Sequence, residues 1–212
     1  MKSDPALGDH LLAEWTASER DVKATGARRR QARLRALELR WEFEDGVEDA
    51  SGEIDAIIEM AEHEHWPDVW HAGMYSALHR SRILDDGTLP AVIERLRIDA
   101  ETSNDPTMLA IALGYRVTSR LTERDPSLAA DADREIARAT ALLEEAEGEP
   151  VERVIGHNIC AVAYGQRQLW ELADEQYTAA EDLLTECEST RHSAVLLFNR
   201  AESQLDWACV LR

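Results

Sequence analysis

The placement of proline limits this 212-residue chain more than any other feature of its sequence. Four of its six prolines open stretches in which apolar residues recur every three to four positions, namely Pro67, Pro106, Pro126 and Pro150. Proline is favoured at the first position of a helix, because the N–H that it lacks has no helical partner there. Asp105, directly before Pro106, is a predicted N-cap. Since no stretch keeps the alternation typical of a strand, the sequence predicts an all-α fold.

The predicted helix pairs begin at regular intervals. Hairpin units are expected to open near residues 28, 67, 106, 151 and 191, so the period is about 40 residues. A period of this length made of two helices is typical of a helical repeat array, in which each hairpin buries its apolar face against its neighbour. The sequence therefore predicts a single helical-repeat domain over residues 1–212, with a capping helix over residues 8–24.

The unit from Val154 to Cys187 carries a more specific pattern. Its characteristic residues are Ala161, Tyr164, Trp170, Ala173, Tyr177 and Ala180. They resemble a tetratricopeptide repeat, which has a small residue and a tyrosine on its first helix, an aromatic after the turn, and an Ala-x3-aromatic-x2-Ala series on its second. Thr185 stands where the repeat usually has a proline. The resemblance implies antiparallel helix pairs stacked as a tetratricopeptide-like superhelical array.

The C-terminal third resembles a region found in one class of signalling protein. The segments concerned are Tyr164–Tyr177, Phe198–Glu202 and Leu205–Arg212. They are similar to the helical-repeat region in front of the GGDEF domain of actinobacterial diguanylate cyclases. No GGDEF motif, cyclase metal site or GTP-binding site occurs in the 212 residues, so no catalytic residue is carried over. The resemblance implies a non-catalytic protein-interaction or sensory module of a cyclic-di-GMP signalling protein, acting by partner binding or dimerisation.

The nature of any output domain is left open by the sequence. Similar helical arrays also precede transcription-factor domains, so the tetratricopeptide region of a transcriptional regulator is an alternative. From Ser193 to Arg212 the apolar residues keep helical spacing, and no glycine or proline closes the helix. We therefore expect the chain to be cut from a longer protein.

The charge of the chain disfavours two classes of partner. Its 23 lysines and arginines stand against 42 aspartates and glutamates, which gives a net charge of −19. A chain this acidic repels phosphate backbones, so no nucleic-acid partner is expected. No run approaches the roughly 18 apolar residues of a transmembrane helix, so no membrane contact is expected. The N-terminal sequence has no apolar signal core and the three cysteines lie far apart, which predicts a cytoplasmic protein.

Positive charge is concentrated in one predicted helix. Residues 27–40 contain six arginines and one glutamate. The candidate electrostatic interface comprises Arg28, Arg29, Arg30 and Arg33. We expect this basic face to meet acidic helices of its own array or of a second subunit in a homodimer. Nucleic-acid binding and simple solvation are the alternatives.

Four histidines and several carboxylates lie between Glu62 and His79. The histidines are His63, His65, His71 and His79. They offer an alternative function as a small helical metal-dependent hydrolase, and histidines beside acidic residues could also sense pH. However, residues two apart on a helix face different directions, and no second helix repeats a Glu-x-x-His pairing. We therefore expect no metal or cofactor, but a helix–turn–helix corner with tryptophans packed beneath and histidines at its rim.

Asn158 and Asn199 are the candidate residues of a partner-binding groove. Both are polar residues on predicted first helices. In tetratricopeptide arrays such positions line the groove and often hold the backbone of a peptide, so the resemblance implies a protein or peptide partner.

One cysteine has a possible catalytic neighbour. Cys160 follows His157 by three residues, so the two side chains could meet on a helix. No oxyanion site or substrate pocket is marked in the sequence, and a cysteine in a helical core usually packs as a small hydrophobic residue. We therefore expect no catalytic residues and no enzyme activity in this chain.

Overall fold

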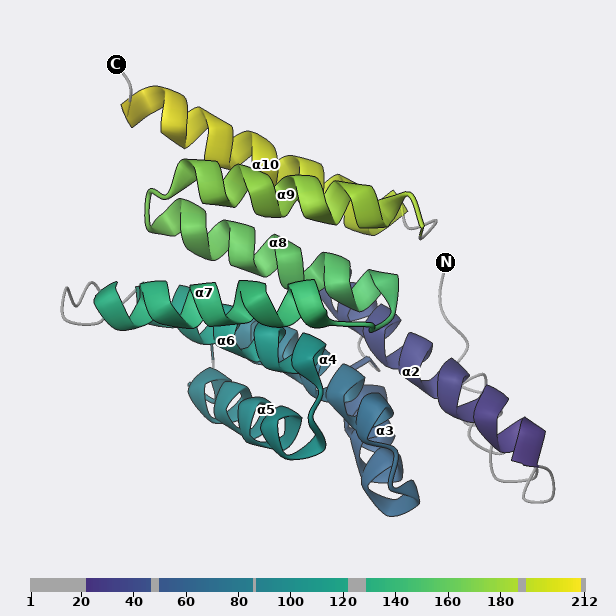
Figure 1. The fold of residues 1–212 in the computed structure, drawn as a ribbon. Coiled ribbons are helices and arrows are strands. Elements are labelled where there is room, and N and C mark those ends of the chain that lie inside the picture. Colours follow the sequence, from purple (N-terminus) through teal and green to yellow (C-terminus); the bar gives the residue numbers. More distant parts are fainter. Residues whose placement is uncertain (1–21, 47–49, 86, 122–128, 187–189, 211–212) are drawn as a thin grey trace. The chain divides into compact units, whose positions relative to one another are not determined.

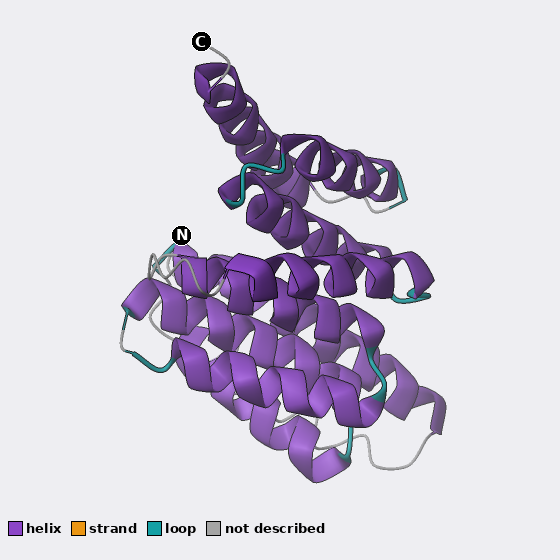
Figure 2. Cartoon of the chain, turned by 60° about the vertical axis from the view of Figure 1, so that its left-hand side comes forward, coloured by secondary structure: helices purple, strands orange, loops and turns teal. Residues whose placement is uncertain are grey.

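The computed structural model describes residues 22–46, 50–85, 87–121, 129–186 and 190–210 (Figure 1). These residues form nine α-helices and no strand, which confirms the predicted all-α class (Figure 2). The helices are α2 (Val22–Glu44), α3 (Ala50–Glu64), α4 (Pro67–Leu84), α5 (Leu89–Ser103), α6 (Pro106–Leu121), α7 (Ala129–Glu145), α8 (Pro150–Gln166), α9 (Trp170–Leu184) and α10 (Thr190–Val210). Within the described ranges, no helix combines the length and the apolarity needed to cross a membrane.

Local signals set the helix starts. Helices α4, α6 and α8 begin at Pro67, Pro106 and Pro150, as the sequence predicts. The Asp105 side chain caps α6, because its Oδ1 accepts a hydrogen bond of 2.9 Å from the Met108 N–H. The predicted start at Pro126 lies outside the described residues.

Left-handed residues end several helices. Among the described residues, positive φ angles outside glycine occur at His65, Asp85, Asn104 and Gln168. His65, Asp85 and Asn104 directly follow α3, α4 and α5, and Gln168 lies just beyond α8. A left-handed residue at a helix end turns the chain sharply and lets the next helix begin within a few residues. Helices adjacent in sequence can therefore fold back on one another as hairpins.

The start of α2 differs from the prediction. This helix begins at Val22 rather than near residue 28 and continues through Gly26. Glycine in a helix interior costs only about 1 kcal/mol relative to alanine, so it need not interrupt a helix that gains contacts elsewhere. The predicted capping helix over residues 8–24 falls mainly on residues 1–21, which lie outside the described part of the chain.

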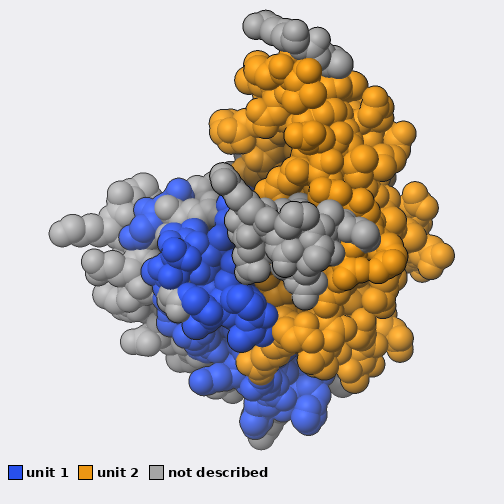
Figure 3. Space-filling view, turned by 90° about the vertical axis from the view of Figure 1, so that its left-hand side faces the viewer, with its two compact units in different colours: residues 1–92 blue, residues 93–212 orange. Residues whose placement is uncertain are grey.

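The chain divides into two compact units, residues 1–92 and 93–212 (Figure 3). In the first unit, α2 and α3 both pack against α4 and against each other. Its core includes Leu39, Ile54, Ile57 and Leu78, which are at most 1% exposed. The prediction of a single repeat domain over residues 1–212 stays a prediction.

In the second unit, helices α6 to α10 form a continuous series of contacts. Helix α6 packs against α7 and α8, and α8 packs in turn against α9 and α10. Glycine allows a close approach of α6 and α8, since a Cβ atom on Gly114 of α6 would lie 2.8 Å from the Ile159 Cγ2 of α8. Ala173 and Ala180 of α9 are fully buried, as expected for small residues on a helix contact face.

The aromatic residues mostly form cores. Those predicted to pack inside are Trp66, Trp70, Tyr75, Tyr115, Tyr164, Trp170 and Tyr177. All except Trp170 are at most 6% exposed, whereas Trp170 is half-buried at the start of α9. Core packing therefore accounts for six of these seven rings within their own units.

Candidate functional site

The two candidate groove residues lie side by side in the second unit. Asn158 belongs to α8 and Asn199 to α10, and both side chains are half-buried. The Asn199 Nδ2 donates a hydrogen bond of 3.1 Å to the Asn158 Oδ1. Their separation of 41 residues is close to one repeat period, so the bond joins similar positions on successive first helices. The fold thus brings together the two residues that the sequence singled out for partner binding.

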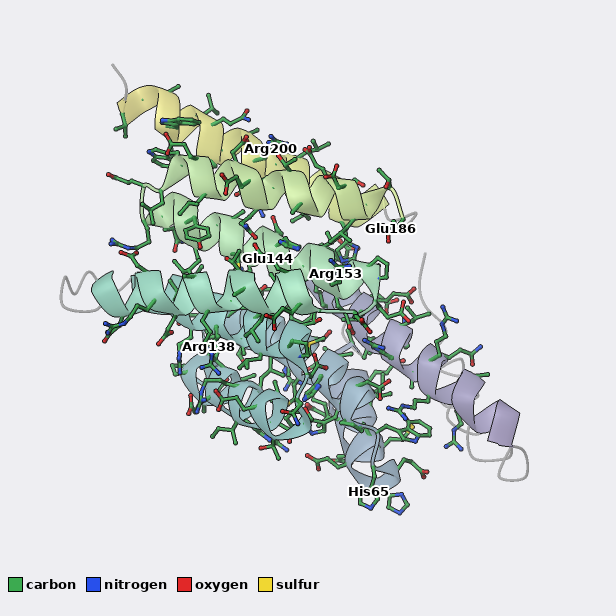
Figure 4. The ribbon with its side chains drawn as sticks, viewed as in Figure 1. His65, Arg138, Glu144, Arg153, Glu186 and Arg200 are labelled. Carbon is green, nitrogen blue, oxygen red and sulfur yellow. The ribbon has the colours of Figure 1, made fainter. Side chains whose placement is uncertain are left out.

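Arg200, next to Asn199, holds α10 against α9 (Figure 4). Its Nε and Nη2 donate hydrogen bonds of 3.0 and 2.8 Å to the Asp174 Oδ1, and its Nη1 donates one of 2.5 Å to the Glu181 Oε2. The bond to Glu181 is the main cause that raises the pKa of Arg200. Together with the Asn199 bond, these contacts fix which face of α10 turns inward.

The predicted electrostatic interface on α2 makes ion pairs within its own unit. Arg29 Nε donates a hydrogen bond of 2.7 Å to the Asp68 Oδ1, and Arg33 Nη1 lies 3.9 Å from the Asp68 Oδ2. Asp68 is in the first turn of α4, where a negative charge also interacts favourably with the helix dipole. Arg30 is exposed. Part of this basic face therefore contacts an acidic residue of a neighbouring helix.

Two other arginines of α2 are held by side chains around them. The Arg28 guanidinium lies over the Trp66 ring, 5.8 Å from its centroid, in a cation–π arrangement. Arg35 donates two hydrogen bonds of 2.8 Å to the two carboxylate oxygens of Glu53 and also bonds Glu42. Its bond to Glu53 is the main cause that raises the pKa of Arg35. These contacts tie α2 to α3 and to the corner before α4.

Sequence reasoning grouped Arg40 with the basic residues, but its side chain lies in the core of the first unit. It is only 5% exposed. It stacks 3.6 Å over the Trp41 ring, donates a hydrogen bond to the Tyr75 Oη, and lies 3.5 Å from the His79 Nε2. Arg40 follows Ala36 by four residues, and both lie on the buried face of α2.

The four histidines do not form one cluster. His63 and His65 are exposed near the end of α3, and Figure 4 shows His65 at that end. His71 and His79 are 1% and 8% exposed, so the prediction that they lie at a rim is wrong. Both belong to α4, which packs against α2 and α3 and is therefore covered along much of its surface. Within the described ranges, no group of three or more His, Cys, Asp or Glu residues is placed to hold a metal ion.

Cys160 and His157 are both buried in α8. Burial raises the pKa of the Cys160 thiol to about 12, so the reactive thiolate is scarce near neutral pH. The His157 Nδ1 lies 2.9 Å from the Gln176 Oε1, and burial is the main cause that lowers its pKa. The arrangement is that of a packed core, in which Cys160 acts as a small hydrophobic residue.

Comparison of the chain with protein families, with curated proteins and with solved structures finds no match. Any function is therefore inferred from the residues and their geometry. Two surfaces stand out: the Asn158–Asn199 pair, and the outer face of α10, where Leu197, Phe198 and Leu205 are each more than half exposed.

Proposed function

We propose that this chain is a non-catalytic protein-interaction module of a cyclic-di-GMP signalling protein of the diguanylate cyclase type. In this proposal its helix pairs stack as a tetratricopeptide-like superhelical array in the cytoplasm. It acts by binding a protein or peptide partner or by dimerising. The resemblance of the C-terminal third to the region in front of GGDEF domains supports the signalling context.

The packing of the second unit supports a repeat array. First helices α6, α8 and α10 make successive contacts, and α7 and α9 each pack against a first helix. The fully buried Ala161, Ala173 and Ala180 belong to the tetratricopeptide-like pattern. In such arrays each hairpin contacts its neighbours and presents one row of first-helix side chains.

The observation that carries the peptide-binding proposal is the hydrogen bond between Asn158 and Asn199. Each primary amide offers two N–H donors and one carbonyl acceptor, and this bond uses one donor and one acceptor of the pair. The remaining polar groups match an extended peptide backbone, which presents both N–H and C=O groups. Because the bond holds both amides in place, little ordering is needed when a peptide binds.

Peptide selection tests this proposal. Peptides are selected from a random library on the purified chain, and their Kd values are measured by fluorescence polarisation. Loss of one or two hydrogen bonds weakens binding about tenfold. We therefore expect the selected peptides to bind Asn158→Ala and Asn199→Ala about tenfold more weakly.

Gln204→Ala serves as the matched control, because Gln204 is an exposed amide on another face of α10. This variant should bind the same peptides with unchanged Kd. The proposal is contradicted if no peptide is selected, or if the selected peptides bind the two asparagine variants as tightly as the unchanged chain.

A further inference from the structure

The inward face of α10 is fixed by three neighbouring residues. Asn199 bonds Asn158 of α8, and Arg200 bonds Asp174 and Glu181 of α9. One turn later, Ser203 lies against α8 at Gly165, where an added Cβ would be 3.3 Å from the Ser203 Oγ. Since a helix turns about 100° per residue, these contacts orient the opposite face of α10 outward.

That outward face is a narrow apolar stripe. It consists of Ala194, Phe198, Ala201, Leu205 and Ala208. All five residues are exposed, and Phe198 and Leu205 are 62% and 66% exposed. Their spacing alternates between four and three residues, which is the heptad spacing of a helix that packs along one partner helix. In a chain of net charge −19, a row without a charged residue is an unusual surface.

We propose that this stripe pairs with the same stripe of a second copy of the chain, with the two α10 helices antiparallel. The inference rests on the dimerisation mode of the proposed function and names its surface. Centred at the level of residue 203, the pairing sets Phe198 opposite the partner's Ala208. It also sets Leu205 opposite the partner's Ala201. Large residues therefore meet small ones at the layers formed by Phe198, Ala201, Leu205 and Ala208, and the interface is the same on both copies, as a two-fold axis requires.

A parallel pair fits the stripe less well. It would place Phe198 against the partner's Phe198 and Ala201 against the partner's Ala201. The helices would then be forced apart at one layer and leave space at the next, which loses packing contacts. The alternation of large and small side chains along α10 therefore favours the antiparallel arrangement.

The exposed area is sufficient for a weak dimer. From ordinary side-chain areas, the stripe with the adjoining Leu197 exposes on the order of 500 Å² of apolar surface per copy. Two copies together bury roughly 1,000 Å², which is near the lower limit for a specific interface. The expected dimer is therefore reversible, with a Kd in the micromolar range.

Within the described side chains of α10, the carboxylate of Glu202 borders the stripe and makes dimerisation depend on salt. Glu202 is exposed beside Ala201, and in the antiparallel pair it lies near the partner's Glu202. Like charges at this distance repel, and salt screens the repulsion. Dimerisation should therefore be stronger at high salt and stronger in Glu202→Gln than in the unchanged chain.

Sedimentation equilibrium of the purified chain tests the pairing. Phe198→Glu and Leu205→Glu should each raise the dimer Kd at least roughly 30-fold, as expected for central interface residues. Ala201→Leu should also weaken the dimer, because the new side chain meets the partner's Leu205. Circular dichroism confirms that each variant is folded. Ile98→Glu is the matched control, since Ile98 is 51% exposed on α5 outside the stripe, and it should leave Kd unchanged.

The orientation is measured with spin labels on Cys209, which is exposed on α10, in a Cys187→Ser background. Cys160 is buried and should remain unlabelled. An antiparallel pair centred at residue 203 places the two Cys209 residues roughly 20 Å apart, whereas a parallel pair places them roughly 10 Å apart. A separation of roughly 10 Å between the two Cys209 residues would overturn the antiparallel arrangement.

The inference is overturned if the chain stays monomeric throughout the micromolar range and up to about 1 mM. It is also overturned if a dimer forms whose Kd is unchanged in both glutamate variants. If the chain stays monomeric and its stripe binds an amphipathic peptide instead, a second copy is not the partner of the stripe. The two proposals are distinguished by their variants: peptide affinity falls in Asn158→Ala, whereas the dimer Kd rises in Phe198→Glu and Leu205→Glu.

Discussion

At the scale of the single residue, burial of His157 favours the neutral form of its imidazole ring. Removal from water is the largest cause that lowers its pKa from the ordinary 6.5, and the nearby Arg153 acts in the same direction. Gln176 and Glu144 oppose this shift. Because the unfolded chain exposes the ring, protonation of His157 favours unfolding.

This shift predicts a loss of stability in mild acid. Below about pH 6.5 the unfolded chain takes up a proton that folded His157 does not, so the free energy of unfolding falls as pH falls toward the lowered pKa. The slope from this one group reaches at most about 1.4 kcal/mol per pH unit. Urea unfolding at about pH 7.5 and pH 5.5 measures the loss. The loss in the free energy of unfolding between these two pH values should be smaller in His157→Gln than in the unchanged chain.

His63→Gln provides the comparison, because His63 is exposed on α3. It should lose as much stability between the two pH values as the unchanged chain does. Equal losses in His157→Gln and the unchanged chain would contradict the account of His157.

Residue type alone predicts burial imperfectly. The apolar spacing of Tyr75 correctly predicts a core position, and the ring is 1% exposed. Arginine usually lies at the surface, yet Arg40 is buried because its partners Tyr75 and His79 come from α4. Such a long-range pairing cannot be read from the residues next to Arg40 in the sequence.

At the scale of the helix, the contact between α6 and α8 depends on Gly114. An added methyl group at this position would meet three side-chain atoms of Ile159 at 2.8, 3.2 and 3.5 Å. Ile159 is branched at Cβ and buried, so it cannot turn aside freely. Gly114→Ala should therefore lower the free energy of unfolding by about 1–3 kcal/mol, measured by urea denaturation.

Gly26→Ala is the matched control, because among the described residues no side chain or neighbouring helix lies within 4 Å of the added Cβ in α2. There the gain in helix propensity should raise stability by up to about 1 kcal/mol. If Gly114→Ala were as stabilising as Gly26→Ala, the close approach of α6 and α8 would not constrain this position.

Helix boundaries were predictable where local chemistry sets them. Proline geometry and the Asp105 cap act within one turn, so the start of α6 could be read from the sequence. The start of α2 could not, because Gly26 costs little in a helix and does not mark a boundary. The outward stripe of α10 was visible as spacing, but its exposure depends on how Asn199, Arg200 and Ser203 fix the helix.

At the scale of the whole molecule, the charge of −19 opposes folding. Raising the NaCl concentration from about 0.1 M to about 1 M shortens the Debye length from roughly 10 Å to roughly 3 Å. Self-repulsion in the compact state then weakens. Exposed ion pairs such as Arg134–Asp131 lose little, because such pairs contribute at most about 1 kcal/mol. The midpoint of urea unfolding should therefore rise with salt.

KCl at the same concentrations should give the same shift, since screening does not depend on which cation is present. A midpoint that falls as salt increases would show that ion pairs outweigh net repulsion in this chain. Dimerisation is kept out of this measurement by working with Leu205→Glu at low protein concentration.

The helical class was predictable because it depends on the local spacing of apolar residues, whereas the rhythm of about 40 residues that marks a repeat array stays a prediction. Asn158 and Asn199 were candidates as polar residues on predicted first helices, but the hydrogen bond between them is known only from the structure. The tetratricopeptide-like superhelix stays a prediction. Its twist depends on small rotations between hairpins, and contacts between residues far apart in sequence set those rotations.

The left-handed residues that end α3, α4, α5 and α8 have a consequence for engineering. His65, Asp85, Asn104 and Gln168 each hold a backbone conformation that costs a side-chain-bearing residue roughly 1–2 kcal/mol, somewhat less for Asp and Asn. Glycine adopts the same conformation without this cost, although it loses more entropy on folding. Among the described residues there are therefore four positions, none of them a member of the Asn158–Asn199 pair or of the α10 stripe, at which a more thermostable form can be sought by substitution with glycine.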